Sequence, residues 1–150
     1  AYANSELAYA GRGLAWRRGG FDRMMKQDIE TRADLDRLLE EFYKVAMKDE
    51  EIGHHFDDLD LETHLPVIGD FWEKVLFGRP VYFNNPLAAH LRLDQKFPLM
   101  PEHFVRWVAI FTRIVDELFN GEMADAAKGR AKMIATNMSN RVNGMRLAYR

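Results

Sequence analysis

Apolar side chains recur every three or four positions along most of the chain, which is the spacing of an amphipathic helix. The first such segment covers residues 31–48, where Thr31 and Asp34 are typical of a helix N-cap with an acidic first turn. Its apolar positions are Leu35, Leu38, Leu39, Phe42, Val45 and Ala46. No segment alternates apolar and polar residues for long enough to form a convincing strand. The sequence therefore predicts an all-α fold.

A second helix is expected to begin at Thr63 or His64, because the preceding segment is too polar and irregular to be helical. Pro66 is expected in its first turn, where a missing N–H group costs nothing. Gly78, followed by Pro80, is expected to end this helix. Its apolar stripe consists of Ile68, Phe71, Trp72, Val75 and Leu76. This helix is therefore predicted to face a core.

Proline, asparagine and glycine mark three further helices. Asn85 and Pro86 open a short helix, Pro101 begins a long one that reaches about residue 120, and Gly121 separates it from the last. The apolar face of the long helix carries Phe104, Trp107, Val108, Phe111, Ile114, Val115 and Leu118. That of the last helix carries Met123, Ala127, Ala131, Ile134, Met138 and Val142. Each of these helices should bury one side.

The chain has 150 residues, a length that suits one domain with one core. Residues 1–27 are rich in glycine, carry an excess of Arg and Lys, and lack a helical apolar pattern. We expect them to be a flexible or artificially appended extension, with the domain over residues 28–150. The remaining sequence is net acidic, so nucleic acid is a poor candidate partner.

The sequence contains no cysteine and no apolar run of the length that spans a membrane. Its beginning also lacks the apolar region of a secretory signal, so we expect a cytoplasmic protein with no membrane partner. Disulfides, thiolate metal sites and cysteine nucleophiles are excluded, which leaves His, Tyr and carboxylates as metal ligands. Motifs typical of hydrolases, nucleotide-binding proteins and zinc proteases are absent too.

Three of the five histidines are expected to be structural or exposed. Glu51 and His54 form one Glu-x-x-His pair, whereas a di-iron bundle needs two. His54 and His55 are adjacent, so on a helix they point in different directions, and we expect both on the surface. His103 lies at the start of the long helix, where we expect it to be solvated. None of these histidines predicts a metal site.

His90 differs, because Leu87 and Leu91 flank it on a short helix and predict that its imidazole faces the interior. A hydrogen-bonded core histidine is one reading of this position. Tyr43, His64 and Trp107 also lie on or beside apolar stripes, and each alone is typical of a structural residue whose polar tip finds an acceptor. A site built from all four is the alternative.

Four stretches in order carry a resemblance: EFYKVAMKDEEIGHHF, THLPVIGDFWEKVLFG, PLAAHLRL and PEHFVRWVAIF. Over residues 28–146 the chain resembles the bacterial truncated hemoglobins of group III. The resemblance implies a globin-like, two-over-two helical sandwich around haem, with His90 as the proximal iron ligand. It also implies that Phe56 contacts the macrocycle, that Tyr43, His64 and Trp107 form the distal ligand-binding cluster, and that Ile68 faces the haem.

Haem b, iron protoporphyrin IX, is a large apolar plate, and the chain offers apolar residues to enclose it. The candidates are Phe56, Ile68, Phe71, Trp72, Leu87, Leu91, Phe97, Met100 and Phe111. The second imidazole nitrogen of His90 should donate to a backbone carbonyl near Pro86 or Leu87, whereas Asp94 is expected to be a solvated acid. Arg92, Lys96 and Arg113 remain alternative partners for the haem propionates.

The resemblance implies a haem protein that binds dioxygen, nitric oxide, carbon monoxide and other small ligands, including peroxide. Two charge-assisted hydrogen bonds of roughly 1.5–3 kcal/mol each could slow ligand escape on the order of 10² to 10⁴-fold. We therefore expect redox or detoxification chemistry, of an oxygenase-like or peroxidase-like kind and fed by an external reductase, rather than oxygen transport. A non-catalytic haem sensor or ligand store, and a haem-free helical interaction domain, are the alternatives.

Overall fold

The computed structural model of the protein describes residues 25–148, which are helical and contain no strand. The prediction of an all-α fold is confirmed. The elements are α3 (Arg32–Ala46), the short 3-10 helix η1 (Gly53–Phe56), α4 (Leu61–Phe77), α5 (Pro86–Lys96), α6 (Pro101–Leu118) and α7 (Glu122–Ala148). Most of the predicted extension lies outside the described residues, and the boundary near residue 28 stays a prediction.

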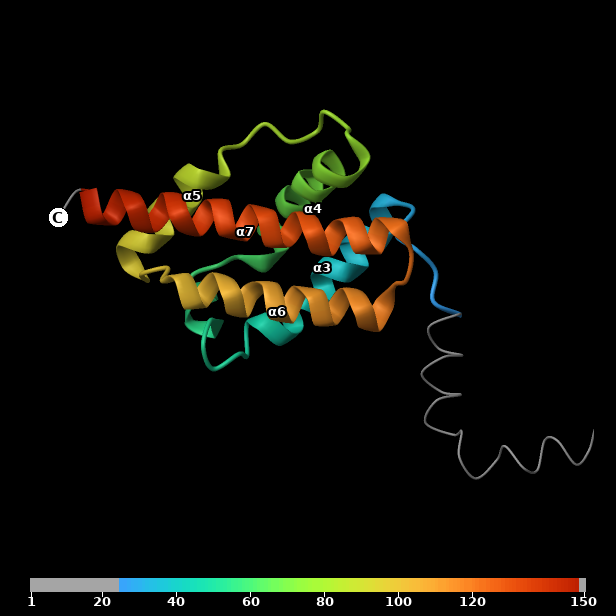
Figure 1. The fold of residues 1–150 in the computed structure, drawn as a ribbon, viewed down its shortest axis with the longest axis horizontal. Coiled ribbons are helices and arrows are strands. Elements are labelled where there is room, and N and C mark those ends of the chain that lie inside the picture. Colours follow the sequence, from blue (N-terminus) through green and yellow to red (C-terminus); the bar gives the residue numbers. More distant parts are fainter. Residues whose placement is uncertain (1–24, 149–150) are drawn as a thin grey trace, which may run out of the picture.

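Two pairs of helices form the body of the molecule (Figure 1). Helices α6 and α7 run antiparallel beside each other, and α3 and α4 cross behind them. The short helix α5 lies against α7 at the other side of the molecule from the loop that joins α6 to α7. In the described part of the chain, no helix is long and apolar enough to cross a membrane.

The core lies where α3, α6 and α7 meet. Helix α3 contributes large aliphatic and aromatic side chains, whereas α7 contributes Ala124, Ala127 and Ala131, whose small size lets α6 approach closely. The fully buried large side chains are Trp72, Phe42, Phe111, Ile29, Leu35, Leu38, Leu39, Val115 and Val142. Burial of each such side chain contributes about 1.5–3 kcal/mol to folding. This core fixes α3 and α6, the two helices that carry Tyr43 and Trp107.

The predicted caps are confirmed at three helix ends. Thr31 and Asp34 form a reciprocal capping box at the start of α3, and the Asn85 side chain accepts from the backbone N–H of Ala88 at the start of α5. Gly78 ends α4 with φ of 69°, a left-handed conformation that favours glycine. Local sequence therefore determines where these helices begin and end.

The expected start of α4 was wrong, because the helix begins at Leu61 rather than at Thr63 or His64. The Thr63 hydroxyl donates to the Asp60 carboxylate over 2.7 Å, and the His64 N–H donates to the Asp60 carbonyl over 2.9 Å. These bonds make the polar segment helical. Pro66 consequently lies in the second turn, where its ring removes one helical hydrogen bond.

Arg32 joins α3 to α4 beside Pro66. Its guanidinium donates to the Pro66 carbonyl over 3.0 Å and pairs with Asp70 at 2.7 Å. The side chain crosses α4 at Gly69, where an added Cβ atom would lie 2.5 Å from a guanidinium nitrogen. Because Tyr43 is on α3 and His64 is on α4, this link fixes the relative positions of the two residues.

Candidate functional site

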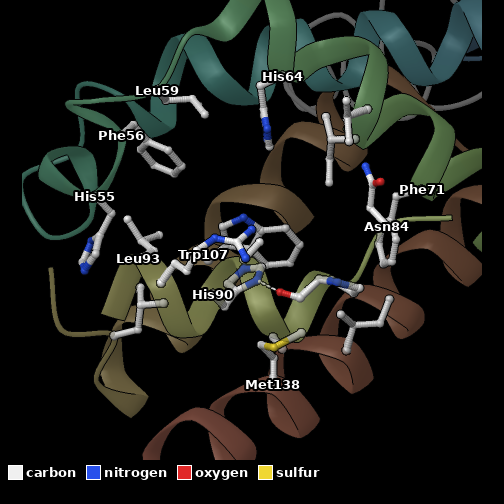
Figure 2. A pocket seen from close by; sticks show the side chains of 18 of the residues that line it. His55, Phe56, Leu59, His64, Phe71, Asn84, His90, Leu93, Trp107 and Met138 are labelled. Atoms are coloured by element: carbon white, nitrogen blue, oxygen red, sulfur yellow. Dashed lines mark hydrogen bonds between the residues drawn. The ribbon is translucent and has the colours of Figure 1, made fainter. Parts of the chain in front are cut away.

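A cavity of about 800 Å³ lies between α4 and α5. Figure 2 shows His64 pointing into it from one side and His90 from the opposite side, with His55 and Phe56 at one end and Phe71 and Asn84 at the other. Most of the remaining lining is apolar and comes from Ile52, Leu59, Val67, Ile68, Trp72, Ala88, Ala89, Leu93, Leu99, Phe104, Ile134, Ala135 and Met138. A volume of this size suits a cofactor-sized ligand.

His90 presents a neutral imidazole to the cavity. Its Nδ1 lies 2.7 Å from the carbonyl oxygen of Pro86, and since a carbonyl can only accept, Nδ1 carries the hydrogen and donates it (Figure 2). This is the backbone bond that the sequence predicted. Burial lowers the pKa of His90, although the bond to Pro86 opposes that effect. Nε2 is therefore left as an unprotonated nitrogen, the form that ligates a metal.

Tyr43 and His64 form a hydrogen-bonded pair on the opposite side. The Tyr43 hydroxyl lies 2.7 Å from His64 Nε2, and the two rings meet edge to face. Tyr43 is only 5% exposed, and burial raises the pKa of its hydroxyl. Burial lowers the pKa of His64, and the neighbouring His90 adds to that effect because the two imidazoles disfavour each other's protonation. Both members of the pair are thus held neutral and within reach of a ligand.

Trp107 joins Tyr43 and His64 as a third polar-tipped residue, because its indole lines the same cavity. The indole stacks on Phe111 with ring centroids 5.2 Å apart, and Phe111 in turn stacks on Trp72 at 4.9 Å. This continuous stack runs from the core to the cavity and fixes the plane of the Trp107 ring. The indole N–H of Trp72 is buried and has no hydrogen-bond partner within the described residues.

The nine apolar candidates separate into two groups. Four of them line the cavity, namely Phe56, Ile68, Phe71 and Trp72. The other five, Leu87, Leu91, Phe97, Met100 and Phe111, are not among its lining residues. On α5 the cavity is lined instead by Ala88, Ala89 and Leu93, beside His90 itself. Phe111 lies one layer deeper, behind Trp107.

His55 corrects a sequence expectation, since it is 5% exposed rather than on the surface. Its two ring nitrogens face the carbonyl oxygens of Ile52 at 3.2 Å and Pro98 at 3.1 Å. His54 is exposed, as expected. His103 is half-buried and lines the cavity, and its Nδ1 accepts from the Met100 N–H over 3.0 Å at the start of α6. No local motif distinguishes His55 from His54, because the burial depends on a residue 43 positions away.

Asp94 is the second correction. The carboxylate is 11% exposed rather than solvated, and it pairs with Arg146 from the far end of α7. Tyr82, Asn84 and Met138 also line the cavity, although they are not among the residues predicted to contact a cofactor. Met138 could have been found from the helical spacing of α7, whereas Tyr82 and Asn84 lie in the irregular connection between α4 and α5.

The residues of the cavity fit a flat apolar macrocycle with one central metal ion. The lining is mostly apolar, and the His90 imidazole projects into the cavity from α5 with an unprotonated nitrogen. Among residues 25–148 there is no cluster of three or more His, Cys, Asp or Glu side chains that could hold a metal ion. The donor set therefore suits a metal that brings most of its own ligands, as haem iron does.

Comparisons with known proteins agree with this chemistry. No family model matches the chain. The group 3 truncated hemoglobin ctb of Campylobacter jejuni is 31% identical over 122 residues, which cover 77% of this chain and 94% of that protein. A crystal structure of group III truncated hemoglobin from Campylobacter jejuni superposes with a TM-score of 0.70 at 31% identity, covering 79% of this chain and 95% of the other. The chain therefore belongs to the group III truncated hemoglobins, a family of globin-like haem proteins that bind small gaseous ligands.

Proposed function

We propose that the protein holds haem b between α4 and α5, with His90 as the proximal iron ligand. The observation that carries this proposal is the position of His90 across one apolar cavity from the hydrogen-bonded pair of Tyr43 and His64. When bound, haem supplies an iron centre that can bind and reduce small oxygen- and nitrogen-containing ligands. The remaining chemistry comes from the chain's own side chains.

The proximal residues prepare the imidazole and enclose the macrocycle. The Pro86 carbonyl fixes the His90 tautomer and orients the ring, which strengthens the imidazole as a ligand. Phe56, Ile68 and Phe71 would exclude water from the cofactor faces. Arg92 also lines the cavity and is the best candidate to bind the haem carboxylates. Lys96 pairs with Asp58, and Arg113 pairs with Glu117, so both are already engaged.

The distal residues would retain a ligand that carries partial negative charge. Tyr43 and Trp107 offer an O–H and an N–H donor from helices that the core holds rigidly, and His64 can hold or pass on the Tyr43 proton at Nε2. Donors on helices that the core already holds need little movement to reach a ligand, and the same donors can polarise an O–O bond for cleavage. Strong retention is unsuited to oxygen delivery.

We therefore propose that the protein converts dioxygen, nitric oxide or peroxide with electrons from a separate reductase, rather than carrying oxygen. Carbon monoxide would bind at the same place without turnover. A cytoplasmic location, where such electrons are available, stays a prediction.

Absorption spectra of the purified protein test the haem proposal, and turnover tests the reaction. We expect a Soret band in ferric, ferrous and carbon monoxide-bound forms, at one haem per chain. Peroxide or nitric oxide should then be consumed when a chemical reductant is supplied. Absence of a Soret band after reconstitution with hemin would contradict the haem site. Stable haem with no turnover would make the protein a ligand sensor or store.

A further inference from the structure

Helix α5, which carries His90, makes fewer buried contacts with the rest of the chain than α3 does. All of α5 is described, and none of its residues is fully buried, in contrast to the six buried residues of α3. Its main neighbour is α7. Directed polar contacts between α5 and the rest of the chain therefore contribute to the direction in which His90 points.

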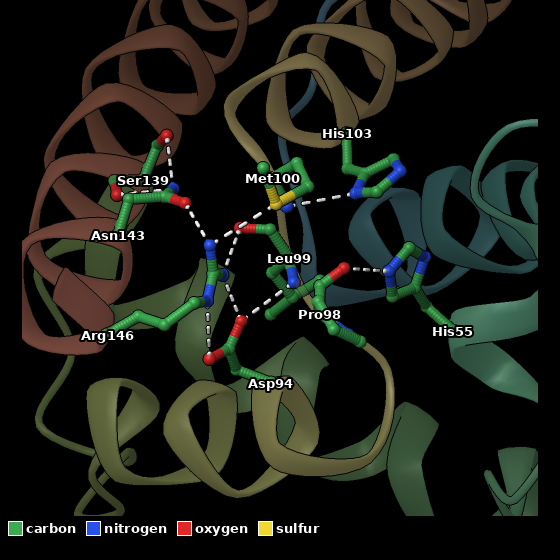
Figure 3. Close-up of polar contacts among 9 residues, drawn as sticks. All are labelled: His55, Asp94, Pro98, Leu99, Met100, His103, Ser139, Asn143 and Arg146. Atoms are coloured by element: carbon green, nitrogen blue, oxygen red, sulfur yellow. Dashed lines mark hydrogen bonds and ion pairs between the residues drawn. The ribbon is translucent and has the colours of Figure 1, made fainter. Parts of the chain in front are cut away.

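The principal polar contact is made by Asp94, which lies one helical turn after His90. Its carboxylate accepts from Arg146 Nε over 3.1 Å, from Arg146 Nη2, and from the Leu99 N–H over 2.8 Å (Figure 3). Although burial opposes ionisation, the bonds from Arg146 and Leu99 lower the pKa of Asp94. The charged carboxylate therefore joins three segments: α5, α7 and the connection to α6.

Arg146 is itself held by several acceptors, and its side chain is 16% exposed. Besides Asp94, its guanidinium donates to the Leu99 carbonyl over 3.0 Å, to Asn143 Oδ1 over 2.7 Å and to Met100 Sδ over 3.2 Å (Figure 3). Only the planar guanidinium of arginine can donate to several acceptors at once in a fixed geometry. Arg146 therefore fixes the end of α5 and the residues that follow it as one unit.

The same connection is held from its other side by His55, whose Nε2 faces the Pro98 carbonyl at 3.1 Å (Figure 3). Leu99 lines the cavity, and α6, which carries Trp107, begins two residues later. The connection from α5 to α6 is thus held by hydrogen bonds on two sides: His55 contacts Pro98, and Arg146 contacts Leu99.

We propose that Asp94 and Arg146 are positioning residues for His90, because their ion pair fixes the carboxyl end of α5 against α7 and so orients the imidazole toward the metal. This inference rests on the proposed role of His90 as the proximal iron ligand. Neither residue touches the cofactor in this role. Loosening the pair would let α5 shift and weaken or misalign the imidazole without removing it.

The test uses haem-loaded, full-length protein with the substitutions Asp94→Asn, Arg146→Gln and Arg146→Lys. Resonance Raman spectra of the ferrous, ligand-free form report the iron–histidine stretching frequency, and transfer of haem to an excess of apomyoglobin reports its dissociation. We expect Asp94→Asn and Arg146→Gln to shift or broaden the stretching band and to speed haem transfer about tenfold, a change of about 1.4 kcal/mol. Arg146→Lys keeps the charge but not the fork, and it should fold and show an intermediate effect.

Arg106→Gln is the matched control. Arg106 pairs at 2.7 Å with Asp49, whose carboxylate is 6% exposed, but this pair lies away from α5. The control should lower thermal stability and leave the stretching band unchanged. An unchanged band and transfer rate in Arg146→Gln and Arg146→Lys, with the same loss of stability as in the control, would reduce the Asp94 and Arg146 pair to a structural role. Absence of any iron–histidine band in the unsubstituted protein would instead overturn the proximal assignment of His90.

Discussion

The two sides of the cavity are held by different forces. On the distal side, Tyr43 and Trp107 project from α3 and α6, which contribute most of the large buried side chains of the core. On the proximal side, His90 projects from α5, which has polar ties to α7 and to its own first turn. Apolar packing holds a helix through many close contacts along its length, whereas hydrogen bonds and ion pairs hold it at a few points with strict geometry.

This difference suggests a division of labour. In the proposed function, the helices that carry the distal donors must keep fixed positions so that only the side chains adjust to a small ligand, and a rigid core provides this. In the proposed function, the proximal helix must aim one nitrogen at the haem iron. A short helix held by a few directed contacts near that nitrogen suits this task. The two sides should therefore respond differently to substitution.

The largest effect is expected from His90→Ala. Since no other imidazole projects from α5, this variant should lose stoichiometric haem, or keep haem only when imidazole is added. The measurement is the ratio of Soret absorbance to protein absorbance after reconstitution. His54→Ala is the control, because His54 is exposed and does not line the cavity. An unchanged ferrous carbon monoxide spectrum in His90→Ala would show that another residue, with His64 the first candidate, ligates the iron.

The next effect concerns stability and separates the two sides directly. Phe111→Ala removes a fully buried ring between Trp72 and Trp107, and we expect it to lower the free energy of unfolding by about 3–5 kcal/mol. Leu87→Ala on the half-buried face of α5 should cost less than about 2 kcal/mol, because the removed side chain is only partly desolvated. Urea unfolding of the apoprotein measures both. Equal losses would contradict the proposed difference in packing.

Much of the fold could be predicted from the sequence because its signals are local. Thr31 with Asp34, Asn85 with Pro86, and Gly78 each determine a helix end through neighbours within a few residues. The bond from His90 to Pro86 was predictable for the same reason, since the donor and acceptor are one turn apart on one helix. The start of α4 was missed although its signal is local, because the bond from Thr63 to Asp60 stabilises a segment of low helical pattern.

The parts of the site that could not be predicted depend on contacts between distant segments. His55 is buried because Pro98 lies beside it, and Asp94 is shielded because Arg146, 52 residues further on, covers it. The pattern of apolar and polar positions reports local periodicity, so it cannot predict contacts between residues that are far apart in the sequence. Leu87 and Leu91 show a further limit: both are apolar and close to His90 in the sequence, but neither lines the cavity.

On the distal side, Tyr43→Phe and Trp107→Phe should each raise the rate of oxygen dissociation. Each substitution removes one donor to a partly charged ligand, which is worth about 1.4–3 kcal/mol, or roughly tenfold to hundredfold in rate. Stopped-flow displacement of oxygen by carbon monoxide measures the rate. The double variant should depart from additivity, because both donors share one ligand.

Tyr82→Phe is the matched control for Tyr43→Phe. Tyr82 also lines the cavity, but it comes from the connection between α4 and α5 and its ring packs on Phe71. The substitution Tyr82→Phe also removes a phenol hydroxyl group, and it should leave the rate of oxygen dissociation unchanged. Unchanged rates in both Tyr43→Phe and Trp107→Phe would mean that other side chains face the ligand.

The smallest effect is expected from His64→Leu, and it should appear mainly in the association rate. His64 lies in the first turn of α4, with its backbone N–H bonded to Asp60, so the helix holds the residue while its side chain extends into the cavity. In the ligand-free protein the imidazole engages the Tyr43 hydroxyl, and that bond must break or turn when a ligand enters. Leucine cannot make the bond, so the ligand should enter a few-fold faster. This corresponds to a barrier to association that is lower by less than about 1.4 kcal/mol. Flash photolysis of the carbon monoxide complex measures the rate. Tyr43 remains free to donate to the ligand, so a large rise in oxygen dissociation would instead make His64 a direct donor.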